Sequence, residues 1–129
     1  MYEKLSEREE YLARHIVDIA IKIHKGLGPG LLEGVYAKCF YYELVKRDIQ
    51  FIKQKEVPII YQTLQIDDGL RLDLLIEDLI IIELKAQENY RPVWGAQLLS
   101  YLKLANTRLG FLINFHVPLM KDGIKRIIL

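Results

Sequence analysis

Residues 71–85 show the clearest alternation of hydrophobic and polar positions in the chain, and this pattern predicts two β-strands joined tightly at residues 77–78. Asp73 interrupts the first apolar strand, while Glu83 and Lys85 interrupt the second. Because successive side chains of a strand point to opposite faces, Glu83 and Lys85 share one face. We therefore expect this hairpin to hold a charged cluster among apolar neighbours.

The register of the hairpin decides whether Asp73 joins that cluster. If Ile76 pairs with Ile80, Asp73 lies opposite Glu83, and this is the register that we expect. A two-residue turn without a bulge would place Asp73 on the other face. In the expected register the second face is entirely apolar, and it consists of Leu72, Leu74, Ile76, Ile80, Ile82 and Leu84.

The first third of the chain predicts two helices. Ser6 and Glu9 match a capping box, and apolar residues at helical spacing continue the first helix over about residues 7–25. The glycine-rich segment 26–30 ends it. His24 lies near this end, where we expect it to hydrogen-bond a carbonyl group or to interact with the helix dipole.

The second helix is expected over about residues 32–47. Glu33 falls in its first turn, where the helix dipole favours a carboxylate. Cys39 is expected to be a small buried hydrophobe. The residues expected on the inner side of this helix are Val35, Tyr36, Cys39, Phe40 and Leu44.

After the second helix the pattern changes to an extended one. Residues 51–55 and 57–61 are predicted to be strands, and Pro58 favours an edge position or a strand start. Residues 62–69 are mostly polar, so we expect a loop there before the central hairpin.

The C-terminal part predicts a third helix and two further strands. Pro92 suits the first turn of the helix, and Gln97 and Tyr101, at positions i and i+4, project from one face. Residues 108–115 and 125–129 are the predicted strands. The whole pattern predicts an α/β fold in the order αα-βββ-α-β-β, with helices on both faces of the sheet.

Composition and charge are those of one globular domain over residues 1–129. The chain is 51% hydrophobic and 27% charged, which excludes a disordered protein. Its 18 Lys and Arg residues nearly balance its 17 Asp and Glu residues, for a formal charge of +1. This balance implies no broad basic face, and it neither requires nor excludes a nucleic-acid partner.

A cytoplasmic location without membrane contact is expected. The lone Cys39 cannot form an internal disulfide, which fits a reducing compartment. The first ten residues are polar and acidic, unlike a signal peptide, and the apolar runs are too short to span a bilayer.

The charged cluster of Asp73, Glu83 and Lys85 permits two interpretations, which the pattern alone leaves open. Either the charges neutralise one another in a salt bridge, or the two carboxylates hold a divalent metal ion. Mg²⁺ prefers oxygen ligands and needs only one or two carboxylates from the protein. In that case Lys85 would position the nucleophile or stabilise developing charge.

A resemblance over nearly the whole chain from about residue 17 favours the metal interpretation. Gly30-Leu-Leu-Glu-Gly-Val-Tyr36 resembles the G-x-x-E-x-x-Y signature of the GxxExxY protein family, which is assigned to the PD-(D/E)xK nuclease superfamily. The other matching segments are Leu70-Arg-Leu-Asp-Leu-Leu-Ile-Glu, Ile82-Glu-Leu-Lys85, Gln97-Leu-Leu-Ser-Tyr101, Leu112-Ile-Asn-Phe115 and Lys121-Asp-Gly-Ile-Lys125.

The resemblance implies a restriction-endonuclease-like core, in which a central mixed β-sheet is flanked by helices on both faces. It also implies DNA as substrate and Mg²⁺ or Mn²⁺ as cofactor. Gln97 and Tyr101 resemble the Q-x-x-x-Y motif of RecB-like nucleases, and Leu72 stands where the superfamily name expects proline. The implied metal ligands are Glu33, Asp73 and Glu83. The implied catalytic set is Asp73, Glu83, Lys85, Gln97 and Tyr101.

Three hypotheses follow from these observations. The first is a Mg²⁺-dependent nuclease that cleaves DNA phosphodiester bonds. The alternative is a catalytically silent nuclease-fold module for nucleic-acid binding or assembly, which the near-neutral charge and small size favour. In the third, the cluster around Asp73 is a buried structural network. Many small proteins of this fold act as dimers, so a homodimer is also considered.

Overall fold

The computed structural model describes residues 4–129 of the chain. Its helices are α1 (Glu7–Leu27), α2 (Glu33–Lys46) and α3 (Pro92–Leu104), together with the short 3₁₀ helix η1 (Met120–Asp122). Its strands are β1 (Phe51–Tyr61), β2 (Leu64–Ile76), β3 (Ile80–Lys85), β4 (Leu109–Asn114) and β5 (Ile124–Ile128). The predicted order αα-βββ-α-β-β is confirmed.

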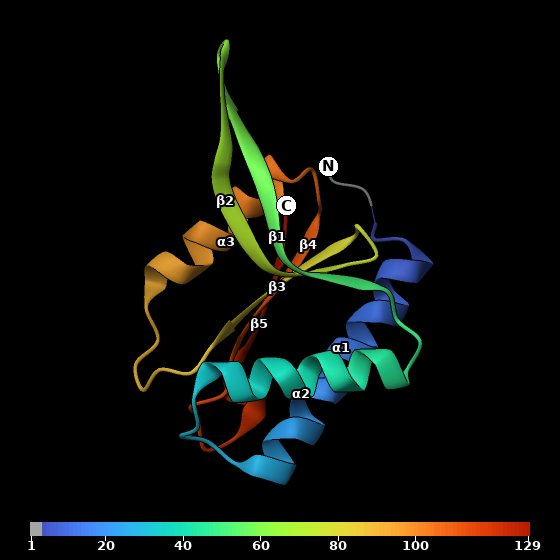
Figure 1. Cartoon of the computed structure of the whole chain (residues 1–129). Coiled ribbons are helices and arrows are strands. Elements are labelled where there is room, and N and C mark those ends of the chain that lie inside the picture. Colours follow the sequence, from blue (N-terminus) through green and yellow to red (C-terminus); the bar gives the residue numbers. More distant parts are fainter. Residues whose placement is uncertain (1–3) are drawn as a thin grey trace.

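The five strands form one mixed sheet in the order β1-β2-β3-β4-β5. Among the strands of residues 4–129, only β3 and β4 pair in parallel, and α3 makes the crossover between them that a parallel pair requires. Helices α1 and α2 cover one face of the sheet and α3 covers the other (Figure 1). This is the α/β architecture of a restriction-endonuclease-like core, as the sequence predicts.

Two apolar clusters fill the space between the helices and the sheet. The cluster on the α1–α2 side includes Leu74, Ile76, Ile80, Ile82 and Leu84 of the central hairpin. Leu72 instead packs on the α3 side with Leu75 and Ile81, so the prediction of an unbroken apolar face from Leu72 to Leu84 is wrong.

A backbone irregularity on the neighbouring strand β1 lies opposite this break. Lys53 pairs with Leu74 and Lys55 with Leu72, so Gln54 lies opposite Asp73. Gln54 has a positive φ of 54°, which interrupts the regular alternation of strand side chains. Opposite this irregularity, the facing of β2 changes between Leu72, which packs on the α3 side, and Leu74, which packs on the α1–α2 side.

Helix α1 begins as predicted. The Ser6 hydroxyl accepts a hydrogen bond from the Glu9 amide, and the Glu9 carboxylate accepts one from the Ser6 amide, which completes the capping box. Near the other end, Nε2 of His24 lies 2.7 Å from the carbonyl oxygen of Val117. The expected histidine–carbonyl contact is thus present, and it ties α1 to the segment after β4.

Helix α2 is held by Tyr36, whose ring stacks on Phe115 with centroids 4.3 Å apart. The Tyr36 hydroxyl donates to the carbonyl of Gly28 and accepts from the amide of Leu31. These contacts fix the loop before α2 and so the start of the helix. Val35 is 39% exposed, so its predicted inward position is wrong.

The reason is the ridge that α2 turns toward the sheet. This ridge is formed by Tyr36, Phe40 and Leu44, spaced four residues apart, and all three are fully buried. Val35 is one residue before the ridge and therefore points about 100° away from it. Cys39 is half-buried and packs against the same cluster.

The β1–β2 hairpin projects from the body of the molecule as a long two-stranded arm (Figure 1). Instead of two short strands, β1 is one strand with a register shift between Val57 and Ile59. Instead of a loop, residues 64–69 belong to β2, which pairs with β1 as far as Tyr61 and Leu64. The polar pattern resembles a loop because both faces of the arm's outer part meet solvent.

None of the helices within residues 4–129 combines the length and apolar character needed to cross a membrane.

Gly123, which ends η1, tests the packing of the β4–β5 connection. A Cβ at this position would lie 2.2 Å from the carbonyl oxygen of Asn114, so Gly123→Ala is expected to destabilise the fold by about 1–3 kcal/mol. Gly26→Ala is the matched control, because nothing lies within 4 Å of its added Cβ. The control should be neutral or stabilising by up to about 1 kcal/mol. Urea denaturation measures both variants, and equal effects would contradict the described packing.

Candidate functional site

Asp73 and Glu83 bind each other's strand at the junction of β2 and β3. The backbone amide of Asp73 donates to Oε2 of Glu83 at 2.9 Å, and the amide of Leu84 donates to Oδ2 of Asp73 at 2.9 Å. The pairing of Ile76 with Ile80 confirms the expected register and leads to this juxtaposition. Hydrogen bonds from side chains thus replace backbone hydrogen bonds where the regular β2–β3 pairing ends.

The two carboxylates lie in an environment that opposes their charge. Glu83 is only 6% exposed, and burial, followed by the nearby charge of Asp73, raises its pKa to about 8. Burial also raises the pKa of Asp73, against the opposing effects of the Leu84 amide and Lys85. At neutral pH this pair therefore carries less negative charge than two exposed carboxylates.

Residues from both helical layers contribute to the same electrostatic cluster. Glu33, the first residue of α2, has a pKa raised by desolvation and by the charge of Asp73. Tyr101 of α3 has a pKa raised by burial and by the charges of Glu83 and Asp73, while its hydrogen bond with Gln97 lowers it. The structure thus brings together the site residues predicted on β2, β3, α2 and α3.

Lys85 lies at the end of β3, half-buried, and its charge lowers the pKa values of Glu33, Asp73 and Glu83. Its Nζ atom is 5.4 Å from the centroid of the Trp94 ring. Within residues 4–129, no salt bridge of 4 Å or less joins Lys85 to a carboxylate. The first interpretation, in which Lys85 neutralises Asp73 and Glu83 through a salt bridge, therefore does not describe the observed arrangement.

Two side chains next to Lys85 were missing from the predicted site. Trp94 supplies the aromatic surface described above. Asn114 accepts hydrogen bonds from the amides of Gln87 and His116 and donates one to the Gln87 carbonyl, which fixes the loop after β3. The matching segment Leu112-Ile-Asn-Phe115 was a signal for Asn114, whereas nothing in the spacing of Trp94 distinguishes it from a core residue.

The donor chemistry of the cluster fits a hard divalent cation. Each carboxylate uses one oxygen for a backbone amide, and Oδ1 of Asp73 and Oε1 of Glu83 accept no hydrogen bond within the described part of the chain. Residues 4–129 hold no group of three or more Asp, Glu, His or Cys residues close enough to define a complete metal site. Two carboxylates nevertheless suffice for Mg²⁺, which keeps several water ligands.

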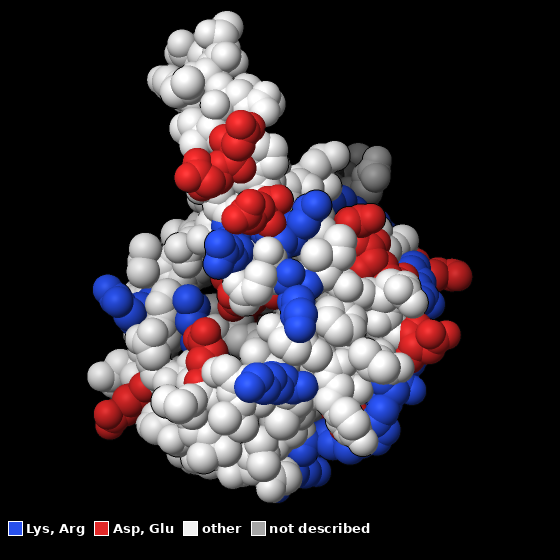
Figure 2. Space-filling model, viewed as in Figure 1, with Lys and Arg blue, Asp and Glu red and all other residues white. Residues whose placement is uncertain are grey.

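The surface below the base of the projecting arm is hollowed. Figure 2 shows acidic atoms set back in a hollow below the base of the projecting arm, with Lys and Arg side chains around it. A ring of cations around recessed carboxylates suits an anionic substrate that must approach a negatively charged centre.

Comparison with protein-family models gives one match, to the PD-(D/E)XK nuclease superfamily over residues 10–127. The chain belongs to this superfamily, whose members generally use divalent metal ions. Searches among curated proteins and among solved structures gave no significant match.

Glu83→Gln tests the electrostatic cost of the site in the metal-free protein. Because the folded-state pKa is about 8 and the ordinary value is 4.5, the folded protein holds a proton that the unfolded chain releases. Stability is therefore expected to fall as the pH rises from about 4.5 to about 8. The glutamine keeps an oxygen for the Asp73 amide but carries no charge, so the variant should be more stable than wild type by about 2–4 kcal/mol at pH 8.5.

Urea denaturation in EDTA at pH 5 and pH 8.5 measures this difference, with Glu88→Gln on the exposed loop as the matched control. The control should follow wild type at both pH values. A Glu83→Gln curve that declines as steeply as the wild-type curve would contradict the described environment of Glu83.

Proposed function

We propose that this protein is a Mg²⁺- or Mn²⁺-dependent nuclease that cleaves phosphodiester bonds in DNA, and that it is a member of the GxxExxY family. The observation that supports this most strongly is the buried pair of Asp73 and Glu83. Their pKa values are raised, each has an oxygen without a hydrogen bond among the described residues, and no neighbouring cation forms a salt bridge with them. A bound divalent cation would relieve the cost of their charge.

Asp73 and Glu83 would hold the metal ion directly. Glu33, in the first turn of α2, would join them as a third acidic ligand through a metal-bound water, because residues 4–129 hold no close group of three such side chains. Burial raises the pKa of Glu33 most and the charge of Asp73 raises it further, and the second effect supports this grouping. The ion, when bound, supplies Lewis-acid chemistry at the phosphoryl group and acidifies water.

The remaining site residues would act on the substrate. Lys85 carries an ammonium beside the two carboxylates, where it would orient the attacking water or stabilise charge on the phosphoryl oxygens. Gln97 is exposed on α3 and interacts with Tyr101, so the pair would contact the DNA backbone next to the metal ion.

Nuclease assays with plasmid, linear duplex and single-stranded DNA test this proposal. Cleavage is expected with Mg²⁺ or Mn²⁺ and not with EDTA. Glu83→Gln and Lys85→Ala should each lower kcat by about 10²-fold or more, because they remove metal-binding or charge-stabilising groups. The exposed Glu7→Gln is the matched control and should keep wild-type activity.

Cleavage that persists in both site variants would contradict the proposal, since a contaminant would then explain it. Calorimetric titration separates the remaining possibilities. A nuclease should bind Mn²⁺ in a manner that Asp73→Asn abolishes. Absence of both metal binding and cleavage would favour the catalytically silent module for nucleic-acid binding or assembly.

We also propose that the chain forms a homodimer through the arm, residues 57–70. Four large apolar side chains on the arm are exposed: Ile60, Tyr61, Leu64 and Ile66. The arm contains Asp67 and Asp68 but no Lys or Arg, and the white tip in Figure 2 reflects this. A two-stranded ribbon is marginally stable alone, and its acidic character disfavours nucleic acid as its partner.

A hollow between α1 and α2 supports a second copy of the chain as the occupant. It has a volume of about 380 Å³ and is lined by apolar groups of Leu27, Cys39 and Tyr42. Lys38 also lines it and would complement Asp67 or Asp68 of an inserted arm. Single-domain organisation and a cytoplasmic location, by contrast, stay predictions from the sequence.

Analytical ultracentrifugation tests the dimer. Wild-type protein is expected to sediment as a dimer at micromolar concentrations, and a Tyr61→Ser and Leu64→Ser double variant as a monomer, because the variant loses the apolar contact at the arm's tip. Thr63→Ser in the adjoining turn is the matched control. A wild-type protein that stays monomeric at the highest soluble concentration would contradict the proposal.

A further inference from the structure

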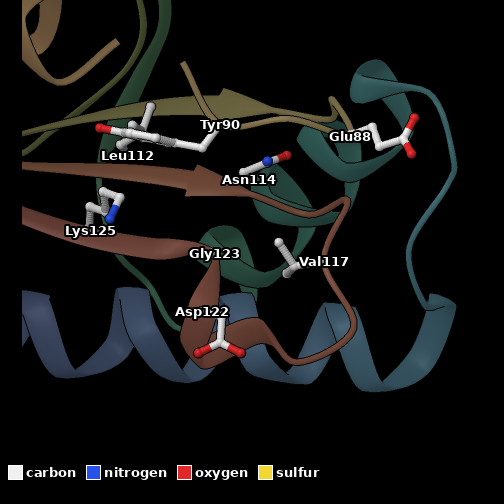
Figure 3. A pocket seen from close by; sticks show the side chains of 8 residues that line it. All are labelled: Glu88, Tyr90, Leu112, Asn114, Val117, Asp122, Gly123 and Lys125. Carbon is white, nitrogen blue, oxygen red and sulfur yellow. The ribbon is translucent and has the colours of Figure 1, made fainter. Parts of the chain in front are cut away.

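A cavity of about 230 Å³ opens beside the candidate site and is lined by residues of β4, β5 and the loops around them (Figure 3). Leu112, one of these residues, packs on the side of the sheet that α3 covers. The sheet register explains its position. Glu83 pairs with Leu112, and Leu112 pairs with Lys125, so these three side chains stand in one row across the sheet. Lys85 pairs with Asn114 in the next row. Leu112, Asn114 and Lys125 line the cavity, so the cavity lies next to Glu83 and Lys85 on the same face of the sheet.

Two aromatic rings connect Lys85 with Lys125 along this face. The Nζ atom of Lys85 lies 5.4 Å from the centroid of the Trp94 ring, and Nζ of Lys125 lies 4.7 Å from that of Tyr90. The two rings pack edge to face with centroids 5.6 Å apart. Cation–π contacts hold both ammonium groups in place without neutralising their charge.

Lys125 keeps its charge available for an anion. Within residues 4–129 it forms no salt bridge. The acidic residues Glu88 and Asp122 also line the cavity, but Figure 3 shows Glu88 at the opposite end from Lys125 and the Asp122 carboxylate pointing away. These carboxylates would repel a phosphate from their own ends and so direct it toward the end formed by Tyr90 and Lys125.

The turn before β5 fixes where Lys125 stands. The carbonyl of Gly123 accepts a hydrogen bond of 2.8 Å from the amide of Asn114, and no side chain fits at Gly123 because Asn114 lies against it. The turn therefore packs directly on the end of β4, and Lys125 follows two residues later on the face of the candidate site.

We propose that Lys125, held in place by Tyr90, binds a phosphodiester group of the nucleic-acid strand close to the one that is cleaved. This inference rests on the proposed nuclease function and adds a second contact for the same strand. Lys125 lies two strands from Glu83, about 10 Å away, which is the span of a few nucleotides. Lys125 is the binding residue, and Tyr90 is a positioning residue.

Steady-state cleavage of short oligonucleotides by the full-length protein tests the subsite. Lys125→Gln is expected to raise KM about tenfold with kcat nearly unchanged, because one charged contact to the substrate is lost. It should also reduce the slope of log(kcat/KM) against log salt concentration by about 0.7–0.9. Lys121→Gln, an exposed lysine outside the cavity, is the matched control and should change neither quantity. Tyr90→Leu should raise KM less, and Tyr90→Phe should restore it.

A second set of substrates locates the contact. In these oligonucleotides one phosphodiester is replaced by a neutral methylphosphonate, at a different position in each. At one position the replacement should weaken cleavage by the wild-type protein but should not weaken cleavage by Lys125→Gln any further. If wild type cleaves DNA while Lys125→Gln behaves like Lys121→Gln, the subsite is wrong and the nuclease proposal stands. If wild type neither binds nor cleaves nucleic acid, both fail. Melting curves check that each variant is folded. If Lys125→Gln does not fold, Tyr90→Leu takes its place: the proposal expects that the methylphosphonate at the sensitive position no longer weakens cleavage by this variant, and an unchanged sensitivity would contradict it.

Discussion

Two acidic side chains that repel each other are held side by side at the β2–β3 junction because each accepts a hydrogen bond from the backbone of the opposite strand. The amides of Asp73 and Leu84 would otherwise need partners in the strand ladder, which ends at the pairing of Leu74 with Ile82. Glu83 and Asp73 thus replace ladder bonds with side-chain bonds. The pairing of β2 with β3 and the geometry of the site depend on the same four groups, so a substitution that removes the acceptor oxygen at either position would destabilise the sheet.

This exchange also explains why helices on both sides of the sheet reach one site. Asp73 lies where β2 changes its facing, opposite the left-handed Gln54, and the sheet there no longer separates its two faces strictly. Glu33 approaches from α2, whose start is fixed by the buried Tyr36, and Tyr101 approaches from α3. A flat, regular hairpin would have kept the two helical layers apart.

The parts of this arrangement that follow from local rules could be predicted from the sequence. The capping box at Ser6, the start of α3 at Pro92 and the pairing of Ile76 with Ile80 each depend on residues near one another in the chain. The facing of Leu72 could not be predicted, because the break in alternation lies beside a positive φ at Gln54 on another strand, which no local pattern of β2 indicates. The outer part of the arm, residues 64–69, was predicted to be a loop for a similar reason. Strands that pair beyond the core bury neither face, so their sequence shows no alternation of apolar and polar residues.

The charge of the site ties its chemistry to the stability of the fold. Glu83 gives up its proton only near pH 8 in the metal-free protein, so at neutral pH most folded molecules carry a protonated Glu83, which is the wrong state for binding a cation. A metal ion must displace that proton, and its apparent affinity should therefore rise with pH up to about 8. Lys85 makes this displacement easier, since its charge favours the ionised form of both carboxylates. Its Nζ atom lies over the Trp94 ring and forms no salt bridge within the described residues. A lysine that did pair directly with Glu83 would stabilise the empty protein and compete with the metal ion for the same oxygen atoms.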